Sequence, residues 1–451
     1  MEKLNSKVRL KESKYNHFFK TDDGCVLAYN AFSNSFAKVT TENFLIIEEI
    51  LANTEHYTYR TPLQKKLKDD LLRGGFLIDA GLDEFAILKA QHSIGRFANR
   101  VLSLTIAPTL ACNFKCTYCF ERPKADTMPL EVEEALVQFI DKKLQTLKML
   151  NISWFGGEPL LKMDIIERLS SKFVELCEKH GARLNPASII TNGFLLTRDV
   201  AARLINAGIN SAQITLDGIP EVHDKRRRLA GGKGTFWQIV ENIKNMPDSI
   251  QLLVRINIDK ENADKLEAFY DLWTKEGLSE RATFYFGQVR ANSPVCADIA
   301  NQCFTTREYS DLIISLLLKA RKYGISNIRY PTLYKAGYCC ADNLNGFVVA
   351  PSGNIFKCWE EISSDDEAAV ANLTNNDSKP HYIMNTVKYL NWDPFSNKEC
   401  KECNILPICS GGCIFIGLNS LENKECNFWR YNLKAMLQLK YQELNKKKLG
   451  G

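Results

Sequence analysis

The sequence has no long hydrophobic run. None of its apolar stretches approaches the roughly 20 residues that a helix needs to cross a bilayer. The first residues, MEKLNSKVRLKESKYN, are too charged to contain the apolar core of a signal peptide. We therefore expect a cytoplasmic protein that has no membrane partner.

The sequence also lacks a strong excess of either charge. Its 58 Lys and Arg against 53 Asp and Glu leave a net charge of +5, and the basic residues are dispersed, so we expect no nucleic-acid partner. Internal repeats and low-complexity stretches are absent as well. A chain of 451 residues with 45% hydrophobic residues predicts a globular protein of two or three domains.

Cysteine, by contrast, is abundant. A reducing cytoplasm argues against a disulfide framework for the 15 cysteines, and most of them fall into two groups with short spacings. Metal ligation explains both facts. The four that stand alone are expected to be core or surface thiols: Cys25, Cys177, Cys296 and Cys303.

Hydrophobic patterns divide the chain into three regions. Residues 1–95 predict a small α+β module with a helix over Thr41–Ala52, and residues 96–330 alternate strand and helix, which predicts an α/β barrel of parallel strands. Residues 331–451 are irregular and rich in cysteine until a final helix begins near Asn427, so this domain is expected to depend on metal for stability. In such barrels the chemistry lies at the C-terminal ends of the strands.

The first cysteine group directly follows the first strand of the barrel region. Cys112, Cys116 and Cys119 have the spacing C-x3-C-x2-C. Three thiolates hold three corners of a [4Fe-4S] cube and leave one iron without a protein ligand, whereas electron-transfer clusters normally have four. A zinc site, or a ferredoxin-like loop with a distant fourth cysteine, remains open.

This motif, with Tyr118 as its aromatic residue, resembles the signature of the radical S-adenosylmethionine (radical SAM) superfamily. The resemblance implies a partial (β/α)6 barrel. It also implies that the open iron chelates S-adenosyl-L-methionine, whose cleavage gives a 5′-deoxyadenosyl radical that abstracts hydrogen from carbon.

Other segments are similar to the cofactor site of that family. They are the GGEP motif (Gly156, Gly157, Glu158), the TNG segment (Asn192) and the TLDG…HD…R segment (Thr215, Asp217, His223, Asp224, Arg227). For the last two segments, a turn or capping role is as acceptable as direct contact with the cofactor.

The second cysteine group resembles the SPASM domain, which binds two auxiliary [4Fe-4S] clusters and would bring the total to three. By this resemblance Cys400, Cys403, Cys409 and Cys426 hold the distal cluster, and Cys340, Cys358 and Cys413 hold the proximal one. Cys339 or Cys303 would close the proximal site. If neither does, the proximal cluster would keep an open iron that could bind the thiolate of a substrate cysteine.

The N-terminal module resembles the winged-helix domains with which peptide maturases bind a precursor's leader as an extra strand. A plain cap over the barrel is the alternative. The chain as a whole is thus similar to maturases that join a Cys sulfur of a ribosomally made precursor peptide to a carbon as a thioether, the sactipeptide or ranthipeptide type. A flavodoxin or ferredoxin would donate electrons.

Three alternatives remain. One is a sulfatase-type maturase, although relatives of that type have an aspartate base right after the cysteine that corresponds to Cys358, where this chain has Trp359 and then Glu360. Another is a maturase that forms carbon-carbon crosslinks or epimerises residues, and the third is a non-catalytic iron-sulfur or zinc protein. No general base can be assigned; Glu360 is a weak candidate.

Overall fold

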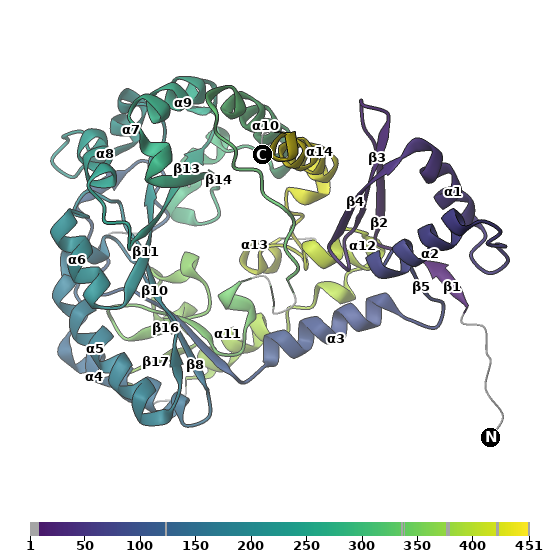
Figure 1. Cartoon of the computed structure of the whole chain (residues 1–451). Coiled ribbons are helices and arrows are strands. Elements are labelled where there is room, and N and C mark those ends of the chain that lie inside the picture. The colour runs from purple at the N-terminus through teal and green to yellow at the C-terminus, as the bar shows by residue number, and fades with distance from the viewer. Residues whose placement is uncertain are drawn as a thin grey trace.

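The computed structural model describes residues 9–121, 124–334, 337, 339–375, 379–420 and 424–449. Figure 1 shows a small N-terminal module beside a large barrel of strands and helices, with parts of the C-terminal region between the two. Among the described residues, no helix has both the length and the apolar character needed to cross a membrane.

The N-terminal module is a three-stranded antiparallel sheet with two helices packed on one face. Its strands pair in the order β2 (Asn16–Lys20), β3 (Cys25–Asn30) and β4 (Ser35–Thr40), so β2 and β4 are edges. Helices α1 (Thr41–Ala52) and α2 (Pro62–Gly74) share a core with β3, and β1 (Leu10–Glu12) pairs antiparallel with β5 (Leu77–Asp79). The helix predicted over Thr41–Ala52 is confirmed.

Local signals explain where these helices begin and end. The Thr40 hydroxyl accepts a hydrogen bond from the Asn43 amide at the start of α1, and Thr61 forms a capping box with Gln64 at the start of α2. Gly75 ends α2 because its φ of 74° is a left-handed conformation that favours glycine.

The barrel consists of six parallel strands, each followed by a helix. Its strands, in spatial order, are β6 (Val101–Ile106), β8 (Met149–Trp154), β10 (Ala187–Ile190), β11 (Ile209–Thr215), β13 (Gln251–Ile258) and β14 (Ala282–Gln288). Helix α3 (Glu84–Phe97) leads into it. The predicted alternation of strand and helix is confirmed.

Helices cover the outside of these strands (Figure 1). They are α4 (Leu130–Leu144), α5 (Met163–His180), α6 (Arg198–Asn206), α7 (Pro220–Arg226), α8 (Phe236–Lys244), α9 (Leu266–Lys275) and α10 (Thr306–Ala320). Helix α4 illustrates why they pack there: Leu136, Ile140 and Leu144 recur at helical spacing and are fully buried in the main core. Short strands β7 (Phe114–Cys116), β9 (Arg183–Leu184) and β12 (Arg227–Leu229) complete this region.

The C-terminal region extends the barrel sheet beyond its first strand. Strand β15 (Gly346–Val349) pairs parallel with β6, and β16 (Asn354–Phe356) and β17 (Ala371–Asn372) follow antiparallel. Its helices are α11 (Pro380–Leu390), α12 (Lys398–Glu402), α13 (Ile414–Leu418) and α14 (Trp429–Leu449), the last beginning close to its predicted start. Since β15 joins β6, this region is attached directly beside the loop that follows β6.

Candidate active site

A cavity of about 450 Å³ lies at the C-terminal ends of the barrel strands, where chemistry is expected in such barrels. Residues at or just after the ends of five strands line it, namely Gly156, Asn192, Thr215, Asn257 and Gln288. The three cysteines of the first group also line it: Cys112, Cys116 and Cys119. The three cysteines whose spacing predicted a cluster site therefore do lie together, beside the strand ends.

The GGEP glycines lie directly against the backbone of the cysteine loop. A Cβ on Gly157 would stand 2.4 Å from the Ala111 carbonyl oxygen, and one on Gly156, whose φ is 113°, would stand 2.4 Å from the Thr109 carbonyl oxygen. The Gly157 amide donates to Thr109 at 3.2 Å and the Glu158 amide donates to Ala111 at 2.9 Å. These glycines hold the cysteine loop in place by close approach.

Glu158 joins two segments of the predicted cofactor site but does not line the cavity. Its buried carboxylate accepts hydrogen bonds from the Thr191 hydroxyl at 2.7 Å, the Asn192 amide at 2.8 Å and the Leu160 amide at 3.1 Å. The Asn192 side chain in turn donates to Asn113 in the cysteine loop at 2.7 Å. Glu158 therefore positions Asn192, which does line the cavity.

Arg227 is held beside the cysteine loop by a two-stranded ribbon. Strand β12 pairs antiparallel with β7, so that Arg227 lies opposite Cys116. One guanidinium nitrogen donates to the Tyr118 hydroxyl at 2.7 Å, whereas the buried Nε has no hydrogen-bond partner among the described residues. A buried donor without a partner on the wall of a cavity is suited to an anionic group such as the carboxylate of S-adenosyl-L-methionine.

The remaining residues of the TLDG…HD…R segment lie behind the cavity wall. The Asp217 carboxylate accepts hydrogen bonds from the Tyr118 hydroxyl and from the Asn257 amide, and Asp224 caps α8 by accepting from the Thr235 and Phe236 amides. The buried ring of His223 accepts from the Asp217 amide, and burial lowers its pKa. This segment therefore divides into the cavity-lining Thr215 and Arg227 and a network that supports Tyr118.

The thiols that line the cavity are suitable ligands for an iron-sulfur cluster. Three thiols from one loop share it, and burial raises the pKa of the Cys112 and Cys119 thiols to about 12. Thiols that are neutral without a cation would lose protons as iron binds. Within the described ranges, no three His, Cys, Asp or Glu side chains are placed to hold a single metal ion.

Several cavity residues were not predicted. Gln213 and the predicted Thr215 on β11, and Arg255 and Asn257 on β13, are polar residues at alternate positions, so each pair lies on one face of its strand, a signal that the strand pattern contains. Glu121 also lines the cavity, where burial and the carboxylates of Glu158 and Glu360 raise its pKa to about 8.

Glu360, the weak candidate base, lines the same cavity. One of its carboxylate oxygens is buried and has no hydrogen-bond partner in the described part of the chain. Burial raises the pKa of this carboxyl, while Asn292, Arg255 and Arg290 oppose the shift.

The four cysteines expected at the distal cluster gather around one small cavity: Cys400, Cys403, Cys409 and Cys426. Burial, followed by the charges of the other three thiols, raises the pKa of Cys409 to about 12. Arg430 on α14 donates to the Cys403 sulfur at 3.3 Å.

Among the cysteines expected at the proximal cluster, Cys358 lies near Cys413 and also near Cys339, which the sequence suggests only as a possible additional ligand. After burial and Glu361, the charges of Cys339 and Cys413 raise the pKa of Cys358, whereas Cys340 is next to Trp359 and Lys357. Cys303 lies elsewhere, where its sulfur donates to the Ile299 carbonyl at 3.4 Å. Of this set, Cys413 lines the large cavity together with the first cysteine group.

Comparison with known families agrees with this geometry. Residues 106–272, which lie within the barrel, match the model of the Radical SAM superfamily. Relatives of the chain include maturases. The chain is 24% identical over 322 residues to the mycofactocin maturase of Mycolicibacterium smegmatis, across 69% of this chain and 78% of the relative.

The chain is also 24% identical over 374 residues to the cysteine-type anaerobic sulfatase-maturating enzyme of Clostridium novyi, across 72% of this chain and 90% of that enzyme. Among solved structures it resembles Streptococcus suis SuiB bound to its precursor peptide SuiA, with a TM-score of 0.52 and 12% identity over 93% of this chain and 98% of SuiB. At that identity the likeness concerns the fold.

Proposed function

We propose that this chain is a radical SAM enzyme that modifies a ribosomally made precursor peptide by joining a cysteine sulfur to a carbon of another residue as a thioether. The observation that carries the proposal is the position of Cys413. This expected ligand of the proximal auxiliary cluster lines the same 450 Å³ cavity as Cys112, Cys116 and Cys119. An auxiliary cluster at Cys413 would therefore border the space in which the substrate reacts.

The residues have distinct roles in this proposal. When bound, the clusters supply the electron that cleaves S-adenosyl-L-methionine and an acceptor for the electron released when the thioether forms. Cys112, Cys116 and Cys119 would hold the first cluster, and Arg227 and Asn192 would bind the polar end of the cofactor. The peptide loses one hydrogen atom from carbon, and one proton and one electron from the reacting thiol, as the new bond forms.

The N-terminal module would bind the leader of the precursor. Strands β2 and β4 are the edges of its sheet, and an extended leader would pair its backbone with one of them. A flavodoxin or ferredoxin would supply electrons, and the distal site at Cys400, Cys403, Cys409 and Cys426 would carry a further cluster.

The test begins with iron and sulfide content after anaerobic reconstitution. We expect about twelve irons per chain in the wild type and about eight when Cys112, Cys116 and Cys119 are all changed to Ala. Cys177→Ala is the matched control, since this buried thiol lies in α5 and is not among the cysteines expected to hold any of the three clusters. It should leave the iron content unchanged. About four irons together with zinc would contradict the auxiliary clusters.

The reaction is then tested with Cys-containing peptides encoded beside the gene, by mass spectrometry of peptide incubated with enzyme, reductant and S-adenosyl-L-methionine. A thioether product has lost two hydrogen atoms and one free thiol. Loss of sulfur instead would indicate the sulfatase-type reaction. That reaction needs a base, and the Glu360 oxygen in the cavity, which has no hydrogen-bond partner among the described residues, favours it as second candidate. Unchanged mass with intact cofactor would contradict both.

A further inference from the structure

Two arginines on one side of the barrel form no ion pair with any described carboxylate. The first, Arg255 on β13, lines the active-site cavity and donates from Nε to the Asn257 side chain at 2.7 Å. Gly287 on the neighbouring strand makes room for it, because a Cβ there would lie 2.5 Å from the Arg255 Nε. The Arg255 guanidinium is thus positioned by Asn257 and by the space at Gly287 rather than by an acidic partner.

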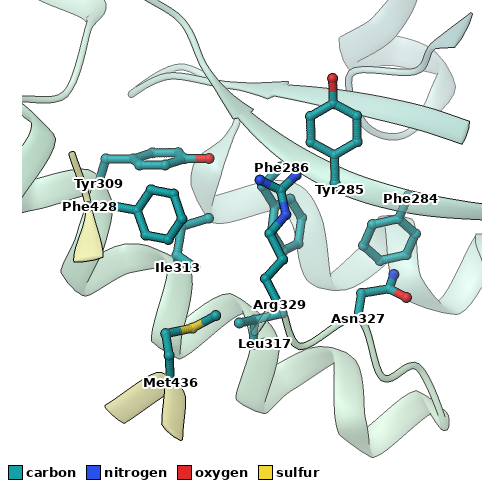
Figure 2. Close-up of a pocket in the computed structure, with 10 residues that line it drawn as sticks. All are labelled: Phe284, Tyr285, Phe286, Tyr309, Ile313, Leu317, Asn327, Arg329, Phe428 and Met436. Carbon is teal, nitrogen blue, oxygen red and sulfur yellow. The ribbon is translucent and has the colours of Figure 1, made fainter. Parts of the chain in front are cut away.

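The second, Arg329, follows α10 in the sequence and lies over Tyr285 of β14. Its guanidinium carbon is 4.7 Å from the centre of the Tyr285 ring, and its side chain is exposed. Figure 2 shows Arg329 reaching up from the segment of Asn327 to place its charged end among the aromatic side chains of Phe286, Tyr285 and Tyr309. These residues line a smaller pocket of about 50 Å³.

Tyr285 and Tyr309, which line this smaller pocket, lie near residues of the active-site cavity. The Tyr285 hydroxyl donates to the Gln213 side chain at 2.8 Å, and Gln213 lines the active-site cavity. Tyr309 is close to both arginines: burial raises its pKa, and the positive charges of Arg329 and Arg255 oppose the rise. Arg255 on β13 is also paired in register with Tyr285 on β14, and Arg329 lies over the Tyr285 ring, so Tyr285 is a neighbour that the two arginines share.

The neighbouring charges do not neutralise this pair. Arg290, the third arginine here, is paired with Glu425. Glu360 lies near enough to Arg255 and Arg290 for their charges to oppose the rise in its pKa, but it forms no ion pair within the described residues. Arg329 lies over the Tyr285 ring and forms no ion pair within the described residues.

We propose that Arg255 and Arg329 bind the side-chain carboxylate of an aspartate or glutamate of the precursor peptide, next to the residue that reacts. A planar guanidinium pairs with a carboxylate through two parallel hydrogen bonds, and a guanidinium stacked on an aromatic ring is already oriented for such a pair. The acid would fix the register of the peptide in the cavity. This inference rests on the proposed function, because it names the class of peptide that the site accepts.

The test measures binding and needs no turnover. A display library of random short peptides, each with one cysteine, is selected on the immobilised, iron-loaded full chain at physiological ionic strength, and the recovered sequences are counted. We expect Asp and Glu to be enriched about tenfold over Asn and Gln on the wild type, and this preference to fall to near unity on Arg329→Gln and Arg255→Gln.

Arg307→Gln is the matched control. Arg307 is also exposed and lies over an aromatic ring, 6.0 Å from the centre of Tyr431, but it lines neither pocket. Its variant should retain the acidic preference. The proposal is overturned if the wild type shows no such preference, or if Arg329→Gln keeps it, which would indicate general attraction to a basic protein. Failure of the thioether reaction would appear instead in the mass of the treated peptides.

Discussion

At Gly157 the chain has no room for a side chain. A Cβ would stand 2.4 and 2.5 Å from the carbonyl oxygens of Ala111 and Leu110, both backbone atoms just before Cys112. Gly157→Ala must therefore displace the cysteine loop. We expect the variant to lose about one third of its iron, the share of one cluster among three, as measured by iron and sulfide per chain.

Gly231→Ala serves as the control for this substitution. A Cβ at Gly231 meets nothing within 4 Å, and its backbone does not need a left-handed conformation. Its iron content should equal that of the wild type. Full iron content in Gly157→Ala would show that the loop tolerates the displacement and that the close approach does not determine cluster binding.

The residues predicted at the site differ in how well sequence alone could place them. The spacing of Cys112, Cys116 and Cys119 is local, and the structure does bring the three thiols to one cavity. Arg255 and Gln213 lie within two different strands, and which side chains surround them depends on the pairing of strands that are distant in the sequence. Glu158 was predicted at the cofactor, whereas its carboxylate bonds to Thr191 and Asn192, because the turn after β8 directs it inward.

Helix α3 ties the start of the barrel to the C-terminal region through one buried arginine. The Arg96 guanidinium forms an ion pair with Asp342 and donates to the carbonyl oxygens of Trp392 at 2.7 Å and Tyr389 at 3.2 Å. Both charged side chains are at most 5% exposed. Asp342 lies two residues after Cys340, so the helix supports the loop of the expected proximal cluster.

We expect Arg96→Met to lower the free energy of unfolding by about 3–5 kcal/mol, because it leaves a buried carboxylate without this partner and frees the four carbonyl groups to which Arg96 donates. Urea unfolding of the anaerobic protein followed by circular dichroism measures the change. Arg203→Met on α6 is the control: both side chains of its ion pair with Glu167 are exposed, at 48% and 38%, and the loss should be about 1 kcal/mol or less. Equal losses would contradict the role given to α3.

At the scale of elements, sequence patterns predicted the barrel because each strand and each helix has its own apolar periodicity. The pairing of β15 with β6 could not be predicted in this way. These strands are far apart in the sequence, and β15 has only four residues, Gly346–Val349, so nothing local specifies its partner. That pairing brings the C-terminal cysteines to the barrel.

At the scale of the whole molecule, the N-terminal module contacts the segment that carries Arg329. Tyr330 packs its ring against Tyr29 and Phe36, at 6.1 Å between ring centres in each case. Its hydroxyl donates to the Asn34 carbonyl at 2.9 Å, and the Asn34 side chain donates to the Pro331 carbonyl at 3.0 Å. The expected leader module and the proposed carboxylate site are thus joined through adjacent residues.

If Tyr330 holds the module in place, Tyr330→Ala should loosen both sides of the contact and leave the barrel unchanged. We expect hydrogen-deuterium exchange to become about tenfold faster or more in residues 28–40 and 327–334, since the variant loses an aromatic cluster and a hydrogen bond, while exchange in β8 and β10 stays as in the wild type. Trp237→Ala removes a ring that is 53% exposed on α8 and should change neither segment. Unchanged exchange in residues 28–40 of Tyr330→Ala would mean that the other contacts of the module, such as the hydrogen bond between His17 and the Asn404 carbonyl at 3.2 Å, are sufficient to hold it.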